Sequence, residues 1–325
     1  MRITRGIPVA ADSPVALTIG NFDGVHLGHQ AMLAKLERTA QSRGLASCVM
    51  TFEPHPREFF APDQAPTRLT SLREKLELFA ARGVERAQVC RFNFEFARIT
   101  AQDFIERVLV KGLGARWVLV GDDFRFGARR AGDFVTLKQA ASRFDFEVEA
   151  MSSVTLDGER VSSTGVRTAL AKGDLSRAVR LLGRAYSISG RVVRGDGLGR
   201  KLGFPTANVQ MKHNRPPLSG IFAVELAGVG DLPRRGVASL GVRPTVRQQG
   251  QPVLEVHLFD FDEPLYGRHV RADFLHKFRD EEKYADLATL TRQIALDVES
   301  ARAFFNRQDA KTAKEKFRGT ADKRR

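Results

Sequence analysis

Two histidines in the pattern His-x-Gly-His are the clearest chemical feature of the chain. His26 and His29 close the segment Gly20-Asn-Phe-Asp-Gly-Val-His-Leu-Gly-His29, which follows an apolar run at Val15–Ile19 and leads into helically spaced apolar residues. Backbone N–H groups at a helix start are unpaired and lie at the positive end of the dipole, so they attract phosphate. Two imidazoles there can bind a triphosphate and stabilise a leaving pyrophosphate. The segment therefore predicts adenylyl transfer, and a structural turn is the alternative.

The residues around the histidines predict how a nucleotide reaches this turn. Gly24 and Gly28 lack side chains and let the nucleotide approach the backbone, while Gly20, Phe22 and Asp23 shape the same turn. Each of these residues is therefore a candidate for nucleotide binding.

Two further segments of the first half carry polar groups suited to a nucleotide. In Gly121-Asp-Asp-Phe-Arg-Phe-Gly127, Asp123 can bind a ribose hydroxyl or a phosphate-associated metal, and Phe126 can stack on a planar ring. The alternative there is a turn packed by phenylalanines. In Ser162-Ser-Thr-Gly-Val-Arg167, the hydroxyls of Ser163 and Thr164 and the guanidinium of Arg167 suit a triphosphate. Those hydroxyls can also be plain helix caps.

The second half of the chain holds a glycine-dense basic segment and a carboxylate. The segment lacks Gly-Lys-Ser/Thr and so is not a Walker A loop, but it can cover phosphates with Gly197, Arg200, Lys201, Gly203 and Pro205. Thr206 and Asn208 then offer neutral oxygens to a Mg²⁺ that bridges nucleotide phosphates. Glu255 lies in an alternating strand, where a buried carboxylate can take a proton from a substrate hydroxyl. An exposed strand glutamate is the alternative.

The expected pattern of secondary structure, which positions these residues, changes near Gly183. Before it, strand-like and helix-like segments alternate, which predicts a doubly wound parallel sheet of the Rossmann-like nucleotidyltransferase type. The expected strands are 15–19, 46–52, 86–91, 117–120 and 146–150, and the expected helices are 28–42, 70–82, 100–110 and 134–143. After it, a series of short strands predicts a small β-barrel followed by a terminal helix. The expected strands of the barrel are 187–193, 221–226, 236–240, 253–259 and 269–274, and the expected helix is 286–305.

Composition places the chain among globular proteins of the cytoplasm. Of its 325 residues, 42% are hydrophobic and 28% are charged, and we find neither a membrane-length apolar run nor a signal peptide. Cys48 and Cys90 read as reduced core residues. The tail from Asn306 to Arg325 carries a net charge of +5 of the total +14. We expect three parts, 1–182, 183–305 and a disordered basic tail at 306–325, with no specific nucleic-acid partner and no membrane.

Together these motifs resemble the bacterial bifunctional riboflavin kinase/FAD synthetase family. The resemblance covers about residues 10–305, and further motifs in the same order support it: Phe52-Glu-Pro-His-Pro56, Ser219-Gly-Ile-Phe-Ala-Val224, Ser239-Leu-Gly-Val-Arg-Pro-Thr245, Leu265-Tyr-Gly267 and Arg279-Asp-Glu-Glu-Lys-Tyr284.

The resemblance implies that ATP phosphorylates riboflavin to FMN and that a second ATP adenylylates FMN to FAD. His26 and His29, with Ser163, Thr164 and Arg167, match positions that hold ATP phosphates. Asp123 matches a position near nucleotide and flavin, Phe60 and Phe126 are isoalloxazine neighbours, and Arg279 matches a binding position in the kinase. Thr206 and Asn208 match the Mg²⁺-ATP pair, and Glu255 matches the base that faces the ribityl 5′-hydroxyl.

Three other readings stay open from the residues. A class I aminoacyl-tRNA synthetase shares the His-x-Gly-His pattern, but it usually needs a longer chain with a tRNA-binding domain. An enzyme with one decayed domain would have lost one of the two motif sets, and both are intact here. A flavin- or nucleotide-binding regulator would keep the pockets without turnover.

Overall fold

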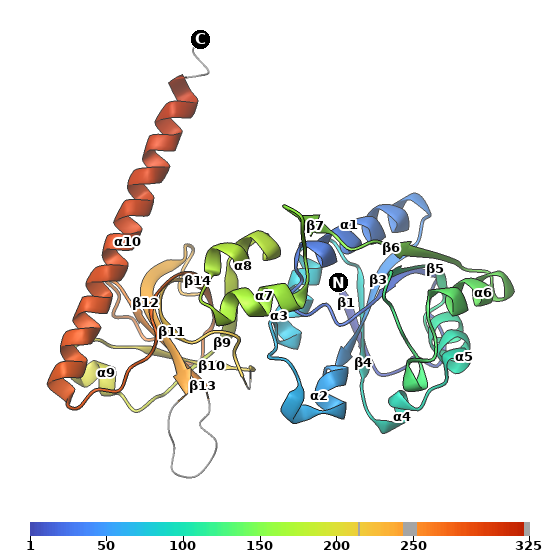
Figure 1. The fold of residues 1–325 in the computed structure, drawn as a ribbon, viewed down its shortest axis with the longest axis horizontal. Helices are drawn as coiled ribbons and strands as arrows, with labels where there is room; N and C mark the ends of the chain where they lie inside the picture. Colours follow the sequence, from blue (N-terminus) through green and yellow to red (C-terminus); the bar gives the residue numbers. More distant parts are fainter. Residues whose placement is uncertain (214, 243–251, 322–325) are drawn as a thin grey trace. The chain divides into compact units, whose positions relative to one another are not determined.

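The chain folds into two compact units. The computed structural model describes residues 1–213, 215–242 and 252–321 (Figure 1). The first unit holds Met1–Val166 and Leu181–Gly183, and the second holds Arg167–Arg180 and the chain from Arg184 onward. The second unit therefore takes in a helical segment that lies before the predicted boundary at Gly183. Part of one family motif, residues 243–245, falls outside the described residues.

A six-stranded parallel sheet forms the first unit, as predicted. Its strands are β1 (Arg2–Arg5), β2 (Val15–Ile19), β3 (Ala46–Glu53), β4 (Arg86–Arg91), β5 (Ala115–Gly121) and β6 (Glu147–Met151), in the order β1-β4-β3-β2-β5-β6. The chain reverses its direction of progress across the sheet between β2 and β5. Ligands of such sheets bind beyond the carboxyl ends of the strands at this point.

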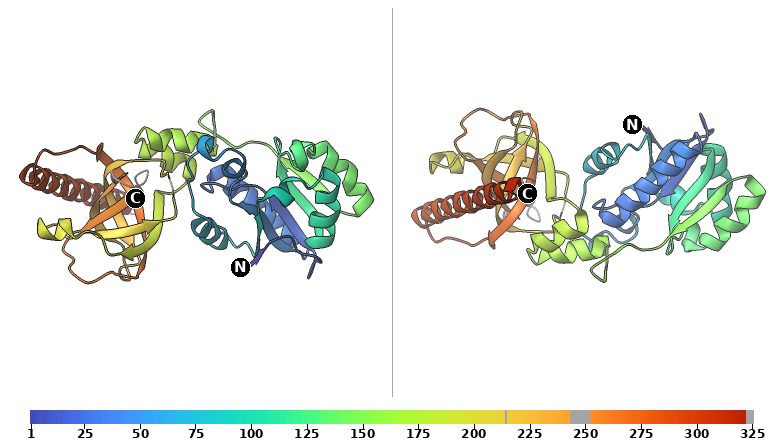
Figure 2. Two further views of the ribbon diagram at one scale, coloured as in Figure 1. Left: turned by 90° about the horizontal axis from the view of Figure 1, so that it is seen from below. Right: turned by 90° about the horizontal axis from the view of Figure 1, so that it is seen from above.

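Helices cover both faces of the sheet (Figure 2). On one face, α1 (Leu27–Ser42) and α3 (Leu72–Ala80) bury Leu33, Leu36 and Phe79. On the other, a π-helical turn (Phe104–Gly112) that continues α5 (Ala101–Asp103) packs with α6 (Phe134–Phe144). Shorter elements connect these: α2 (Pro56–Phe60), α4 (Phe94–Ala97), 3₁₀ turns at 62–64 and 128–130, the hairpin β7 (Thr155–Leu156) and β8 (Glu159–Arg160), α7 (Ser163–Ala171) and α8 (Leu175–Leu182).

The second unit is a closed antiparallel barrel, which confirms the prediction. Its strands are β9 (Tyr186–Val193), β10 (Ala207–Met211), β11 (Gly220–Ala227), β12 (Arg234–Val242), β13 (Pro252–Leu258) and β14 (His269–Arg279). They close in the order β10-β13-β12-β11-β14-β9, because β10 also pairs with β9. Gly190 permits this closure, since a Cβ atom there would lie 2.2 Å from the carbonyl oxygen of Gln210. The short helix α9 (Leu198–Lys201) lies between β9 and β10.

The terminal helix α10 (Leu287–Ala321) is longer than predicted. We expected it to end near residue 305 and the tail to be disordered from 306, but the helix continues to Ala321. Ala301 and Phe305 are buried, and the chain is also tied down beyond the expected end. There Arg235 on β12 forms a two-pronged ion pair with Asp309, with both nitrogen–oxygen distances at 2.7 Å. The good helix formers that follow support the continuation.

Candidate functional site

The two histidines of the His-x-Gly-His pattern lie side by side where β2 gives way to α1. His26 is the N-cap of α1, and its Nδ1 accepts the backbone N–H of His29 at 3.4 Å. Their rings stack with centroids 3.7 Å apart and planes inclined by 17°. The ring of Phe22 lies 5.1 Å from that of His29. Both imidazoles therefore stand at the N-terminus of a 16-residue helix, beyond the carboxyl end of β2.

The turn that carries the histidines has an unusual backbone. Phe22, Gly24 and Val25 have φ angles of 50°, 83° and 42°, and a positive φ is an outlier for a β-branched residue such as valine. Asp23 holds this conformation, because its buried carboxylate accepts the N–H of Leu69 at 3.0 Å and that of Thr70 at 3.1 Å. Strain of this kind concentrates at functional sites.

Burial determines the charge of His29. It lowers the pKa of the imidazole well below its ordinary value, and the neighbouring charges of His26 and Lys75 lower it further. The Nδ1 atom of His29 is buried and has no hydrogen-bond partner within the described residues. His29 is therefore a neutral imidazole at pH 7.

Sequence reasoning missed Lys75, which is only 5% exposed. A signal for it exists in the sequence. Lys75 interrupts the apolar stripe Leu72, Leu76 and Phe79 of α3, and a charged residue on the core side of a helix needs a reason.

The predicted second phosphate segment meets the histidine turn. Ser163 Oγ donates a hydrogen bond to the carbonyl oxygen of Asp23 at 2.9 Å. A Cβ atom on Gly28 would lie 3.2 Å from the ring of His26 and 3.7 Å from the carbonyl oxygen of Val161. Thr164 is exposed at the start of α7, and Arg167 lies one turn later on this helix. Arg167 belongs to the second unit, so its position relative to the histidines stays a prediction.

The two predicted binding residues of the turn after β5 lie in different surroundings. Asp123 is exposed and pairs with Arg160 of β8 at 3.0 Å. Phe126, predicted to stack on a planar ligand, is only 6% exposed and packs in the core between Phe104 and Phe124. Its ring also lies where a side chain of Gly132 would be. Phe126 is therefore a core residue, and Phe124, which stacks on it and is partly exposed, is the ring nearer the surface.

An aromatic cluster lies beyond the carboxyl ends of β3 and β4. Phe60 of α2 is 66% exposed and lies 5.5 Å from Phe92, while Phe94 is 70% exposed and lies 4.8 Å from Phe59. The predicted role of Phe60 beside a flat ring is thus compatible with its exposure.

On the barrel, the sequence-predicted base and metal residue come together. Asn208 of β10 is directly opposite Glu255 of β13, and Glu255 is opposite Ser239 of β12. The alternate residues Leu254 and Val256 point into the barrel, so these three side chains lie on its outer face. A side chain on Gly195 would lie 2.5 Å from Asn208 Nδ2, and one on Gly199 would lie 3.3 Å from Thr206 Oγ1. The glycine-rich segment therefore lies directly against the predicted metal residues.

The remaining predicted binding residues of the barrel divide into two groups. Gly197 is the left-handed N-cap of α9, with φ at 69°, and this short helix carries the exposed Arg200 and Lys201. Gly203, with φ at 86°, and Pro205 follow it, and the Pro205 carbonyl oxygen lies 2.9 Å from His257 Nδ1.

Arg279 is engaged elsewhere than predicted. Its guanidinium holds α10, donating to both carboxylate oxygens of the buried Asp297 at 2.9 and 2.6 Å and to the carbonyl oxygen of Asp280. Because all three guanidinium nitrogens make these contacts, Arg279 anchors the helix in this structure.

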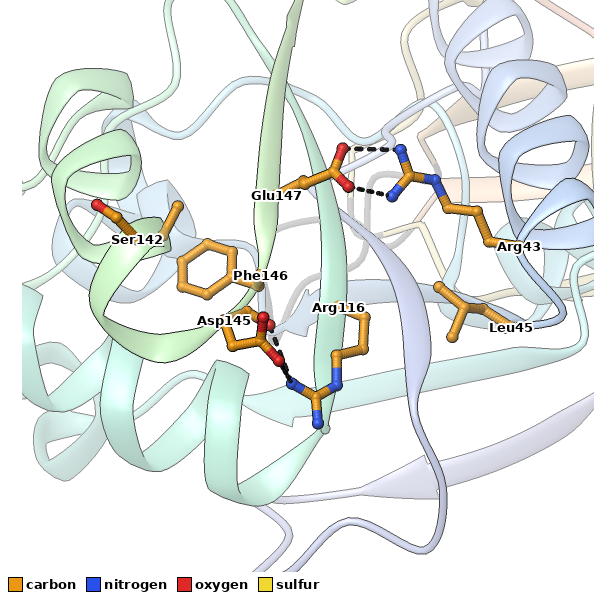
Figure 3. A pocket seen from close by; sticks show the side chains of 8 residues that line it. Arg43, Leu45, Arg116, Ser142, Asp145, Phe146 and Glu147 are labelled. Carbon is orange, nitrogen blue, oxygen red and sulfur yellow. Dashed lines mark hydrogen bonds and ion pairs between the residues drawn. The ribbon is translucent and has the colours of Figure 1, made fainter.

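A hollow of about 470 Å³ lies at the amino ends of the parallel strands, whereas the histidines lie beyond the carboxyl ends (Figure 3). Arg116 and Glu147, at the amino ends of β5 and β6, contribute to its lining. Arg43 pairs with Glu147 at 2.6 Å and Arg116 with Asp145 at 2.8 Å. Both arginines are thus already paired, and the hollow is not part of the candidate site.

Comparison with known proteins assigns each unit to a domain family. The FAD synthetase family model matches residues 9–165, and the riboflavin kinase model matches residues 182–305. Bifunctional riboflavin kinase/FMN adenylyltransferase of Escherichia coli strain K12 is 49% identical over 94% of this chain and 98% of its own length. Its counterpart from Pseudomonas fluorescens is 49% identical over 88% of this chain and 91% of its own length.

A solved structure shares the fold. It is described as a macrolide-efflux protein from Streptococcus pneumoniae, with a TM-score of 0.78 and 28% identity over 93% of this chain and 99% of its own. That description concerns the other protein. Among the described residues here, no helix is both long and apolar enough to cross a membrane. From the two matching domain models and the relatives that align along nearly the whole chain, the chain belongs to the family of bifunctional riboflavin kinase/FMN adenylyltransferases.

Proposed function

We propose that the two reactions of this enzyme occur at two separate sites, one on each unit. FMN is adenylylated beyond the carboxyl ends of β2 and β5, and riboflavin is phosphorylated on the outer face of the barrel around Glu255. The observation that carries this proposal is the pairing of Asn208 on β10 with Glu255 on β13. It brings the proposed metal ligand beside the proposed base on the barrel, at a site to which the histidines do not belong.

In the adenylyl transfer, a phosphate oxygen of FMN attacks the α-phosphorus of ATP. The bond to the bridging oxygen breaks, and pyrophosphate leaves. We expect His26, His29 and the N–H groups in the first turn of α1 to bind the phosphates. Ser163 and Thr164, together with Arg167 as the family motif implies, would stabilise the charge on the leaving pyrophosphate. We expect the exposed side chains of Asp123 and Phe60 to contact the nucleotide and the flavin.

In the phosphoryl transfer, Glu255 takes the proton of the ribityl 5′-hydroxyl as its oxygen attacks the γ-phosphorus of ATP, and ADP leaves. Gly197, Arg200, Lys201, Gly203 and Pro205 belong to the segment that lies over the phosphates.

The donor set at the barrel fits Mg²⁺. Thr206 and Asn208 supply neutral oxygens, and the described residues contain no group of three or more His, Cys, Asp or Glu side chains placed as a metal cage. Such a sparse site suits Mg²⁺, which keeps several waters and is held largely by substrate phosphates. When bound, Mg²⁺ would neutralise charge on the phosphates during transfer. We place the enzyme in the cytoplasm, where its buried free cysteines Cys48 and Cys90 would stay reduced.

The experiment that tests the proposal is a chromatographic time course that resolves riboflavin, FMN and FAD. With riboflavin, ATP and Mg²⁺, the wild-type chain forms FMN first and FAD second. Glu255→Gln should lower FMN formation about 10²- to 10⁴-fold and leave FMN-to-FAD conversion near the wild-type rate. His29→Ala should do the reverse. A single folded variant that stopped both reactions would contradict the two-site proposal.

A further inference from the structure

The segment that follows β14 brings a second carboxylate close to Glu255. Ser239 of β12 lies directly opposite Glu255 of β13, and Ser239 Oγ donates a hydrogen bond to Glu281 Oε1 at 2.8 Å. Gly241, two residues further along β12, makes room for this contact, because the carboxylate of Glu281 occupies the space that a side chain on Gly241 would take. The carboxylate of Glu281 therefore rests on the strand next to the proposed base.

Contacts on both sides of Glu281 hold it in this position. Before it, the side chain of Asp280 pairs with Lys277 of β14 at 2.5 Å, and the carbonyl oxygen of Asp280 accepts a hydrogen bond from Arg279 at 3.0 Å. After it, the ring of Tyr284 lies 5.9 Å from the guanidinium of Arg279, which anchors α10. Because Glu281 is already held in place, little conformational entropy is lost when a ligand binds it.

The polar groups on this face of the barrel are accessible and are spaced by the strands. Glu281 is exposed, and Ser239 and Glu255 are half-buried. Neighbouring strands lie about 4.8 Å apart, so Ser239 and the carboxylate that it binds stand one strand away from Glu255. A ribityl chain has a hydroxyl on every carbon except the first. When its terminal hydroxyl is at Glu255, its inner hydroxyls can therefore reach the neighbouring strand.

Building on the site proposed above for phosphoryl transfer, we propose that Glu281 and Ser239 bind the inner hydroxyls of the ribityl chain. The carboxylate of Glu281 accepts hydrogen bonds from these hydroxyls, and Ser239 Oγ, whose own proton points to Glu281, accepts another. The two residues thereby hold the terminal hydroxyl at Glu255 and make the site selective for a flavin with a polyol side chain.

A purely structural role for Glu281 is the alternative. The segment is, however, already fastened by Asp280 and Tyr284 through contacts that do not involve the carboxylate of Glu281. That carboxylate is instead turned onto β12, where Ser239 faces the proposed base. Hydrogen bonds between a substrate hydroxyl and a charged group contribute strongly to selectivity, because a substrate that lacks the hydroxyl leaves the charged group without its partner.

The test compares riboflavin with a flavin that carries an unbranched hydroxypentyl chain. This analogue keeps the terminal hydroxyl that is phosphorylated and lacks the inner hydroxyls. The ratio kcat/KM for phosphorylation of each flavin is measured on the full chain and on Glu281→Ala, Glu281→Gln and Ser239→Ala. Glu282→Ala is the matched control, because it removes an adjacent exposed carboxylate that contacts the hydroxyl of Tyr284 at 3.5 Å.

Glu281→Ala should lower kcat/KM for riboflavin about 10- to 100-fold and leave that for the hydroxypentyl flavin nearly unchanged. Glu281→Gln keeps an oxygen acceptor without the charge and should retain part of the preference for riboflavin. Ser239→Ala should also reduce that preference, while Glu282→Ala should match the wild type with both flavins. An equal loss with both flavins in Glu281→Ala would show that the residue only supports the fold, and it would overturn the proposal.

Two further measurements keep the test decisive. If Glu281→Ala does not fold, the wild type decides, because equal kcat/KM values for the two flavins would overturn the proposal. If Glu255→Gln forms FMN at the wild-type rate, the proposed role of Glu255 in phosphoryl transfer fails. The comparison of the two flavins still reports whether Glu281 and Ser239 bind the inner hydroxyls, so the two failures are distinguishable.

Discussion

Asn208 and Glu255 form a directly opposed pair across the antiparallel strands β10 and β13, with their side chains on the outer face of the barrel. Opposed residues of such strands bring their Cβ atoms to within about 4.5–5.5 Å of each other. The strand register therefore places a carboxylate beside an amide oxygen without help from any loop. A base and a metal ligand held on strands keep their separation more reliably than groups on mobile segments.

The amide of Asn208 can be tested through the metal requirement of FMN formation. Asn208→Ala removes one candidate oxygen ligand, so the Mg²⁺ concentration needed for half-maximal FMN formation should rise about tenfold or more. Initial rates measured over a Mg²⁺ titration check this. Gln210→Ala is the matched control, since Gln210 lies two residues along the same strand on the same face and is exposed. Equal Mg²⁺ profiles for the two variants would argue against a metal at Asn208.

The stability of the first unit should depend on pH through His29. The folded chain lowers the pKa of this imidazole, so below about pH 6.5 the unfolded chain binds a proton that the folded chain does not. The contribution of His29 to the free energy of unfolding should therefore be complete above pH 6.5. It should be lost as the pH falls toward the pKa of the folded state. Thermal unfolding at a series of pH values measures this. His29→Gln lacks the imidazole, so its Tm should fall less steeply over the same range, and parallel curves would refute the prediction.

Gly24 can be tested against a second glycine with nearly the same backbone angle. Gly24 has φ at 83°, and a Cβ atom there would lie 2.7 Å from Leu69 Cδ1, while Gly6 has φ at 81° with nothing within 4 Å. An alanine costs about 1–2 kcal/mol at either position from the left-handed backbone alone. Gly24→Ala should be destabilising by about a further 1–3 kcal/mol through overpacking and should slow FAD formation. Denaturant unfolding and the FAD assay compare the two variants, and equal effects would exclude a steric role for Gly24.

The helical segment between the family domains should stabilise the barrel. Ala169, Leu170 and Ala178 are fully buried, and Gly173 packs on Lys277 of β14. A chain that begins at Arg167 should therefore phosphorylate riboflavin and melt at a higher temperature than one that begins at Arg184, since a buried leucine alone contributes about 1.5–3 kcal/mol. Thermal unfolding and FMN formation by the two truncated chains check this. Equal melting temperatures of the two truncated chains would mean that the segment does not stabilise the barrel.

Local features were predictable from the sequence. The alternation of strands and helices, the strand–turn–helix around His26 and His29, and the change of rhythm near Gly183 all follow from residue spacing within one element or turn. The missed strands were those with weak local patterns. Arg2–Arg5 is a polar edge strand, and Ala207–Met211 is a short strand close behind Pro205. The length of α10 was missed because an ion pair distant in sequence, Arg235 with Asp309, ties down a segment that reads as a charged tail.

The tertiary structure alone decided which distant residues meet. It joined Asp23 to Leu69 and Thr70, joined Ser163 to the carbonyl oxygen of Asp23, and buried Lys75 beside Thr51. It also buried Phe126 in the core and engaged Arg279 with Asp297. The physical reason is that backbone periodicity reflects only near neighbours along the chain. Burial, strand register and the choice of ion-pair partner depend on packing among residues far apart in sequence, and these set both the charge of His29 and the face of the barrel on which Glu255 lies.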